Sequence, residues 1–339
     1  VAKCRTAAYP TSPDAPAIST RFAMLLPPKA PHGAAAHRIP SPRAPVARPF
    51  PWAHTGPATS WRLPMTSPNV LLATKGHPFQ REPFFSMFDA FQADGGISAW
   101  THVEQPAAQA FFSAEAAAPY DVIVDYSMPG RGIGDADPPQ SLKDGYRSLL
   151  EAGKGMVMIH HNICSWPAWE EYAEMVGGRF FYDPGELRGQ QWPDSGYLLA
   201  VNHNVTVVEP DHPVVEGLDP SFELQDELYL APYFEDNVVP LLRSDFEFTY
   251  KNFFSPALVV HERRMYERGE WSHPPTSNMV SWAKNHYNSP IVYIQPGDVP
   301  TSYNNPNYRK LLSNAIRWVA SEEAHAWARE RNAAAVPGS

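Results

Sequence analysis

The chain has 339 residues, of which 43% are hydrophobic and 19% charged, and its formal net charge is −9. Two cysteines exclude a disulfide framework and a thiolate zinc site, and no apolar run approaches the ~20 residues needed to cross a bilayer. Lys and Arg do not cluster anywhere downstream of Met65, where acidic residues predominate. We therefore expect neither a nucleic-acid nor a membrane partner.

The first 64 residues differ from the rest in composition. They hold 13 of the 37 prolines, eight Lys or Arg and one acidic residue, Asp14. Such a segment cannot bury enough apolar surface to offset its ordering entropy, so we interpret residues 1–64 as disordered or as a non-native leader. Met65 then starts the folded protein, with a domain over 65–321 and a C-terminal tail over 322–339. A cytoplasmic location is the expectation.

Strands and helices are predicted to alternate in the first half of the folded region. The predicted strands are 70–74, 98–103, 121–125 and 156–159, and the predicted helices are 107–118 and three that open near residues 82, 137 and 167. Proline opens those three helices, and the first carries Phe84, Phe88 and Phe91 along one face. Repeated strand-then-helix units indicate a parallel sheet with helices on both faces.

Beyond Gly178 the alternation is less regular. The strand candidates are 197–208, 222–230, 238–242, 257–261, 279–282 and 291–294, with a short helix as the alternative for 222–230. Asn305 and Pro306 open a last clear helix, and the alanine-rich remainder is predicted to be a helical tail. We find no internal repeat and no linker, which favours one α/β domain of about 260 residues.

The most informative stretch is GMVMIHHNICSWPAWEEY, which starts at Gly155. An apolar strand ends there in His160 and His161, and the carboxyl ends of strands are where open α/β sheets bind ligands. Imidazole titrates near neutral pH and is the commonest metal ligand, so the pair predicts a site. Because side chains alternate along a strand, we expect the two histidines to face opposite ways, with one of them lining a crevice.

Several enzyme classes lack their signatures in this sequence. There is no G-x-S-x-G, no G-x-G-x-x-G and no G-x-x-x-x-G-K, which disfavours serine hydrolases, dinucleotide binding and nucleoside triphosphate binding. An amidotransferase would carry its cysteine at the strand end, where this chain has His161. Cys164 follows about one helical turn later, and a buried structural cysteine is the favoured interpretation over a nucleophile.

Other titratable and aromatic residues offer partners for the histidines. His77, His161 and His203 are candidate ligands for a divalent metal, although hydrogen-bonding histidines in a polar pocket are the favoured alternative. Glu227, in FELQDELY, and Asp298, in YIQPGDVP, are candidate general bases, with turn or cap roles as the alternative. Aromatic residues near strand ends suit the stacking of sugar rings, or else belong to the core.

Four segments together resemble the ThuA-like, or trehalose-utilisation, family. They are TKGHPFQREPFFSMFDAF, GMVMIHHNICSWPAWEEYAEMVGGRF, DHPVVEGLDPSFELQDELY and VYIQPGDVPTSYNNPNYRKLLSNAIRWVAS. The resemblance implies a flavodoxin-like sheet similar to that of class I glutamine amidotransferases, without the amidotransferase cysteine, and a link to sugar metabolism. By motif, it also implies these pocket residues: His77, Glu82, His160, His161, Trp166, Glu227 and Asp298. Relatives tend to have Gly-His where this chain has Gly297 and Asp298.

The leading hypothesis is a carbohydrate-active enzyme that acts on a sugar or keto-sugar by acid–base hydrolysis or isomerisation. His161 is its predicted acid or base, with Glu227 or Asp298 as the carboxylate partner. The predicted substrate contacts are His77, Glu82, Tyr126, His160 and Trp166, in which Tyr126 and Trp166 form the sugar platform. The alternatives are a non-catalytic sugar-binding or regulatory module and a metal-dependent hydrolase. Trp271 and Trp327, expected to be exposed, are compatible with a homo-oligomer.

Overall fold

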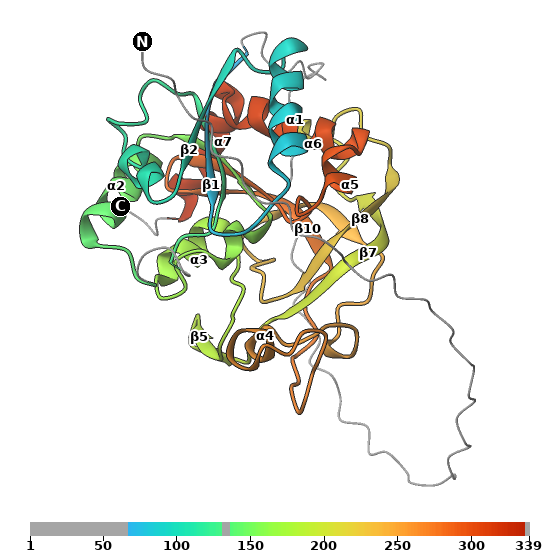
Figure 1. The fold of residues 1–339 in the computed structure, drawn as a ribbon. Helices are drawn as coiled ribbons and strands as arrows, with labels where there is room; N and C mark the ends of the chain where they lie inside the picture. The colour runs from blue at the N-terminus through green and yellow to red at the C-terminus, as the bar shows by residue number, and fades with distance from the viewer. Residues whose placement is uncertain (1–66, 131–135, 336–339) are drawn as a thin grey trace, which may run out of the picture. The chain divides into compact units, whose positions relative to one another are not determined.

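The computed structural model describes residues 67–130 and 136–335, so the predicted leader, 1–64, lies outside the described residues. Helices lie on both faces of a nine-stranded sheet (Figure 1). The strands are β1 Asn69–Lys75, β2 Ala99–Glu104, β3 Val122–Ser127, β4 Gly155–Ile159, β5 Gly185–Leu187, β6 Gln190–Trp192, β7 Gly196–Val207, β8 Ser221–Leu230, β9 Val239–Ser244, β10 Met279–His286 and β11 Ser289–Ile294. The α-helices are α1 Arg81–Ala93, α2 Gln140–Glu151, α3 Glu170–Val176, α4 Pro256–Glu262, α5 Pro300–Tyr303, α6 Pro306–Val319 and α7 Glu322–Ala335. None of these helices has the length and apolar character of a membrane span.

The sheet combines a parallel half and an antiparallel half. Strands β2, β1, β3, β4 and β11 lie side by side in that order, and every neighbouring pair among them is parallel. This is the flavodoxin-like order, which confirms the predicted fold class. The sheet continues antiparallel through β10, β9, β7 and β8, an extension that the sequence pattern did not predict. Strands β5 and β6 form a separate hairpin.

Alternation along the strands builds a separate apolar core on each face of the sheet. On β1, Val70 and Leu72 belong to one core, and Leu71 and Ala73 belong to the other. The first core includes buried residues of α1, α6 and α7, and the second includes those of α2 and α3. The tail segment forms a helix as predicted, and α7 packs against β10 and β11.

Two predicted elements are wrong. In residues 107–118 the regular part is a 3-10 helix over Ala107–Phe111. The hydroxyl of Ser113 accepts a hydrogen bond from the backbone N–H of Ala116, and that of Ser148 accepts one from the N–H of Ala114. These bonds give the segment an alternative to helical hydrogen bonding.

The predicted strand over residues 257–261 is helix α4. Ser255 caps it by accepting a hydrogen bond from the backbone N–H of Leu258, and Pro256 occupies the first turn. A Ser-Pro pair is a strong helix start, and here it overrides the β-branched residues that follow.

Trp271 and Trp327 are partly buried against the first core, so the expectation that they are exposed is also wrong.

Candidate functional site

Segments that follow three parallel strands bring the candidate site together. His77 lies beyond β1, His160 follows β4 directly, and Asp298 lies beyond β11. Glu227 comes from β8, and its backbone carbonyl accepts a 2.6 Å hydrogen bond from Nε2 of Gln295. Polar side chains therefore gather at the carboxyl edge of the parallel strands, where this fold class binds its ligands.

Glycines allow the turns that precede two of these residues. Gly76 has a φ of 111° and Gly297 a φ of 137°, in the region that disfavours other residues. A Cβ atom on Gly76 would lie 2.4 Å from the carbonyl oxygen of Met128, and one on Gly297 would lie 2.6 Å from the hydroxyl of Tyr308. Glycine is therefore required at both positions for the backbone to pass this close to its neighbours just before His77 and Asp298.

His160 and His161 lie in a 3-10 turn rather than on the strand. The strand β4 ends at Ile159, the turn spans His160–Cys164, and His160 has a φ of 50°. The prediction that the two side chains face opposite ways is wrong, because strand alternation has already stopped. Their rings meet edge to face with centroids 5.5 Å apart, and both residues are buried.

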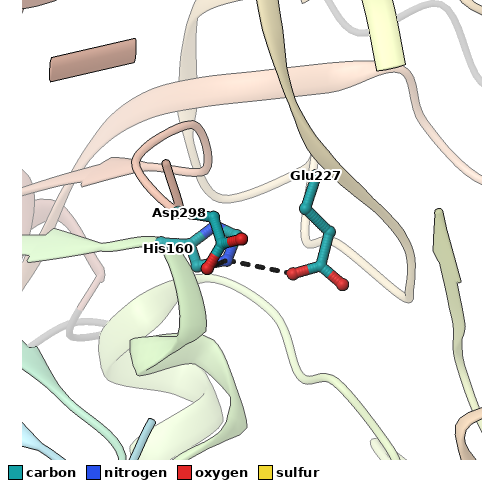
Figure 2. A group of neighbouring side chains, drawn as sticks. All are labelled: His160, Glu227 and Asp298. Atoms are coloured by element: carbon teal, nitrogen blue, oxygen red, sulfur yellow. Dashed lines mark hydrogen bonds and ion pairs between the residues drawn. The ribbon is translucent and has the colours of Figure 1, made fainter. Parts of the chain in front are cut away.

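His160 is the centre of the polar contacts (Figure 2). Its Nδ1 lies 2.7 Å from the backbone carbonyl of Gln295 and donates to it, because a carbonyl can only accept. Its Nε2 lies 3.1 Å from Oε2 of Glu227 and 3.6 Å from Oδ1 of Asp298. The hydroxyl of Tyr229 lies 2.8 Å from the same Nε2 and 3.0 Å from Oε2 of Glu227.

The three imidazoles of the site differ in their electrostatic environment. Burial alone would lower the pKa of His160, but the hydrogen bond to Glu227 and the charge of Asp298 raise it to about 9. Burial lowers the pKa of His161 well below its usual value, and His77 and His160 lower it further. The pKa of His77 is also lowered, by burial and by His160. At neutral pH the site therefore holds one charged and two neutral imidazoles.

The site meets solvent at His77 and Asp298. The side chain of His77 is 31% exposed and that of Asp298 is 16% exposed, whereas Glu227 is 8% exposed and His160 fully buried. Nδ1 of His77 lies 3.7 Å from Oδ1 of Asp298, and its ring stacks on that of His161 at 4.7 Å. Nδ1 faces the carboxylate, so Nε2 of His77 is the nitrogen left to meet a substrate.

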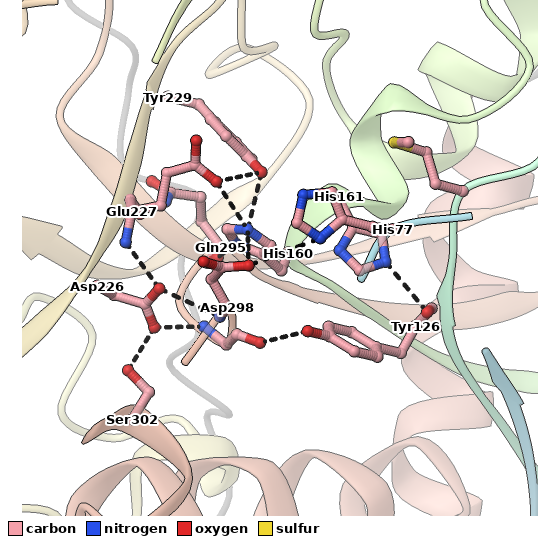
Figure 3. A network of polar contacts seen from close by, with 12 residues as sticks. His77, Tyr126, His160, His161, Asp226, Glu227, Tyr229, Gln295, Asp298 and Ser302 are labelled. Atoms are coloured by element: carbon pink, nitrogen blue, oxygen red, sulfur yellow. Dashed lines mark hydrogen bonds and ion pairs between the residues drawn. The ribbon is translucent and has the colours of Figure 1, made fainter. Parts of the chain in front are cut away.

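Asp226 supports the turn that carries Asp298 (Figure 3). Its carboxylate accepts hydrogen bonds from the backbone N–H groups of Gly297, at 2.7 Å, and Asp298, at 3.1 Å, and from the hydroxyl of Ser302. Burial raises the pKa of Asp226 to about 6, although His160 and these donors oppose the rise. Its contacts are thus with the backbone of the site, and it is a positioning residue.

Tyr126 and Trp166, the predicted sugar platform, are 0% and 1% exposed. The hydroxyl of Tyr126 donates to the carbonyl of Gly297 at 2.8 Å, and its backbone carbonyl accepts from Nε2 of His161 at 3.2 Å. Tyr126 therefore holds Gly297 and His161 in place through hydrogen bonds. Rings buried to this degree cannot stack on a sugar. This corrects the expectation for both residues.

The structure leaves Glu82 and His203 outside the cluster. Glu82 is exposed in the first turn of α1. His203, on β7, is buried, and its Nδ1 lies 2.8 Å from the hydroxyl of Ser244. The predicted metal set of His77, His161 and His203 is therefore not brought together.

Three contributors did not feature among the predicted site residues. They are Asp226, Tyr229 and Gln295, and each contacts a predicted site residue. A weak signal existed for two of them, because Asp226 is the acidic neighbour of Glu227 and Tyr229 is an aromatic residue two positions further along the strand. Gln295 carries no comparable signal, since both of its contacts, with His160 through its backbone carbonyl and with the Glu227 carbonyl through its side chain, are tertiary.

Comparison with known proteins identifies relatives. The ThuA family model, described as trehalose utilisation, matches residues 69–319. A ThuA-like protein structure from Parabacteroides merdae has a TM-score of 0.54 at 15% identity, covering 76% of this chain and 91% of that one. A second, from Bacteroides uniformis, has a TM-score of 0.52 at 16% identity, covering 79% and 96%. At these identities the likeness shows a shared fold. A search of curated proteins found no match.

Proposed function

The chain belongs to the ThuA family, and we propose that it is an enzyme that acts on a sugar or keto-sugar at the site around His160. The description of the family as trehalose utilisation supports a carbohydrate substrate. The observation that carries the proposal is the gathering of His77, Glu227 and Asp298 around a buried imidazole at the carboxyl edge of the sheet.

The reaction class that this geometry supports is acid–base chemistry, as hydrolysis or isomerisation. His77 acts as the general base, because it is the most exposed of the three imidazoles and Asp298 holds its Nδ1 side. A base at this position takes a proton from a sugar hydroxyl or from a carbon next to a carbonyl. Separations longer than a hydrogen bond, such as 3.7 Å, are common before a substrate closes the site.

This assignment moves the catalytic role from His161 to His77. His161 is 1% exposed, and its Nε2 is bonded to the backbone carbonyl of Tyr126. A substrate would therefore have to displace a main-chain contact to reach it. His161 instead stacks beneath His77 and fixes the plane of that ring.

The test is turnover of a panel of disaccharides and their 3-keto forms by the full chain and by Asp298→Asn. Asp298 is partly exposed, so the substitution removes the charge beside His77 with little threat to the fold. We expect turnover of at least one sugar, reduced about 100-fold or more in the variant. The matched control is Asp89→Asn, an exposed position on α1, which should retain full activity. Sugar binding without turnover would instead support a non-catalytic module.

A further inference from the structure

We infer that His160, Glu227 and Asp298 form a binding site for one divalent transition-metal cation of the Zn²⁺ or Mn²⁺ type. Nε2 of His160, a carboxylate oxygen of Glu227 and a carboxylate oxygen of Asp298 all lie within 4.8 Å of one another. The inference goes beyond the proposed function, because it does not depend on which sugar the site takes.

Two of the three distances between these atoms match those between the ligands of one ion, and the third, between the two carboxylate oxygens, is at most 4.8 Å. Nε2 of His160 is 3.1 Å from the Glu227 oxygen and 3.6 Å from the Asp298 oxygen. Two atoms that each lie ~2.1 Å from a zinc ion are about 3.4 Å apart at a tetrahedral angle and about 3.0 Å apart at a right angle. One cation could thus contact all three atoms after small shifts of the side chains.

The surroundings of the three residues favour ligation. The backbone carbonyl of Gln295 accepts the Nδ1 proton of His160, so Nε2 is the nitrogen that would give up its proton and bind a metal. The hydroxyl of Tyr229 lies 3.0 Å from Oε2 of Glu227 and donates to it. Outer partners of this kind orient the ligands of metal sites and fix the histidine tautomer.

The charge balance also indicates a cation. Among the ion pairs of the described residues, Glu227 and Asp298 are paired with histidines and with no Lys or Arg. A largely buried carboxylate needs a compensating positive charge. A divalent cation held by the three residues would supply two positive charges beside these carboxylates.

One buried nitrogen atom beside the cluster also lacks a hydrogen-bond partner. Nδ1 of His161 is buried without a hydrogen-bond partner in the structure, whereas Nδ1 of His77 faces the Asp298 carboxylate at 3.7 Å. His161 is 1% exposed, and its ring contacts those of both His77 and His160. Buried polar atoms are rarely left unpaired, and each exception needs an explanation such as an ion or bound water.

Three protein ligands would leave coordination positions open, as in catalytic rather than structural sites. Asp298, which is 16% exposed, marks the side from which a substrate would reach the ion. A cation here would polarise a carbonyl or hydroxyl oxygen of a sugar. His77 stays outside the ligand set and next to Asp298, where it remains available as a base.

The test is metal binding by the tag-free full chain in the absence of sugar. The protein is stripped with a chelator, dialysed against Zn²⁺ or Mn²⁺, and analysed by elemental mass spectrometry and calorimetry. We expect one equivalent of metal per chain, a rise in melting temperature on binding, and an affinity at least tenfold weaker in Glu227→Gln. The control Glu223→Gln, at an exposed position of the same strand, should bind like the wild type.

Substoichiometric binding by the wild type, or equal affinity in Glu227→Gln, would overturn the inference. Circular dichroism shows whether Glu227→Gln is folded. If it is not, Asp298→Asn takes its place, because that side chain is closer to solvent. The readout contains no substrate, so failure here leaves sugar turnover untouched, and failure of the sugar panel leaves metal binding untouched.

Discussion

Nε2 of His160 lies 3.1 Å from Oε2 of Glu227, although 67 residues separate the two along the chain. His160 comes from the end of a central parallel strand, and Glu227 comes from a strand of the antiparallel half. The candidate site therefore depends on both halves of the sheet. A parallel sheet without the antiparallel extension would supply the histidines and lack one of the two carboxylates.

Replacement of His77 by Gln should lower kcat about 100-fold or more and change KM little. Glutamine retains size and hydrogen-bonding capacity but cannot accept a proton. Initial rates on the sugar that the panel identifies would measure this. His203→Asn, which changes a buried histidine outside the cluster, is the control. Equal kcat in His77→Gln and the wild type would remove the assigned base.

Replacement of Asp226 by Asn should lower the free energy of unfolding by about 1–3 kcal/mol, because an amide cannot satisfy all the donors that converge on the carboxylate. It should also reduce activity, since the same contacts hold the backbone of Asp298. Denaturant unfolding and initial rates are the two measurements. An unchanged unfolding midpoint would show that the turn does not depend on this carboxylate.

Gly297→Ala should destabilise the protein more than Gly95→Ala. Both glycines have positive φ, 137° and 74°, but only the Gly297 position would place a Cβ against other atoms, 2.6 Å from the Tyr308 hydroxyl and 2.8 Å from Cγ2 of Ile159. The φ of Gly297 also lies further from the left-handed region that other residues can adopt, so the steric and backbone contributions act in the same direction. We expect a difference of about 1–3 kcal/mol in unfolding free energy. Equal effects would mean that the segment moves at no cost.

His212 should make the protein acid-sensitive. Burial lowers its pKa from 6.5 to about 3, so between these values the unfolded chain binds a proton that the folded protein does not. The free energy of unfolding must then fall as the pH falls from 6.5, by up to about 1.4 kcal/mol per pH unit. In the wild type, Nδ1 of His212 accepts a hydrogen bond from the backbone N–H of Val214. The variant His212→Asn retains an acceptor for this N–H but has no group that titrates.

The measurement for this prediction is denaturant unfolding of the wild type and His212→Asn at neutral pH and at pH 4.5. The wild type should lose more stability than the variant over this interval. Parallel losses in the two proteins would show that other groups cause the acid sensitivity.

The sequence predicts the fold better than it predicts the site. Proline-led helices after apolar strands are local signals, and they correctly indicate the parallel half of the sheet. The pairing of His160 with Glu227 is a tertiary contact that no local spacing encodes. The expectation that His160 and His161 face opposite ways rested on strand alternation, which ends at Ile159, directly before the pair.

The prediction that Trp166 and Tyr126 stack on a sugar is wrong for a related reason. Residues at strand ends do lie near the site, but a single sequence does not show whether a ring faces solvent or the core. Both rings are buried. The prediction for Glu82 is wrong as well, because this residue lies in the first turn of α1 and outside the cluster.

A crystal structure of the full chain soaked with the sugar that it turns over tests most directly whether the site around His160 binds that sugar. We expect the sugar to lie at the carboxyl edge of the parallel strands, within hydrogen-bond distance of Nε2 of His77 and of the Asp298 carboxylate. A sugar bound elsewhere, with this edge of the sheet unchanged, would show that the cluster around His160 is not the sugar site.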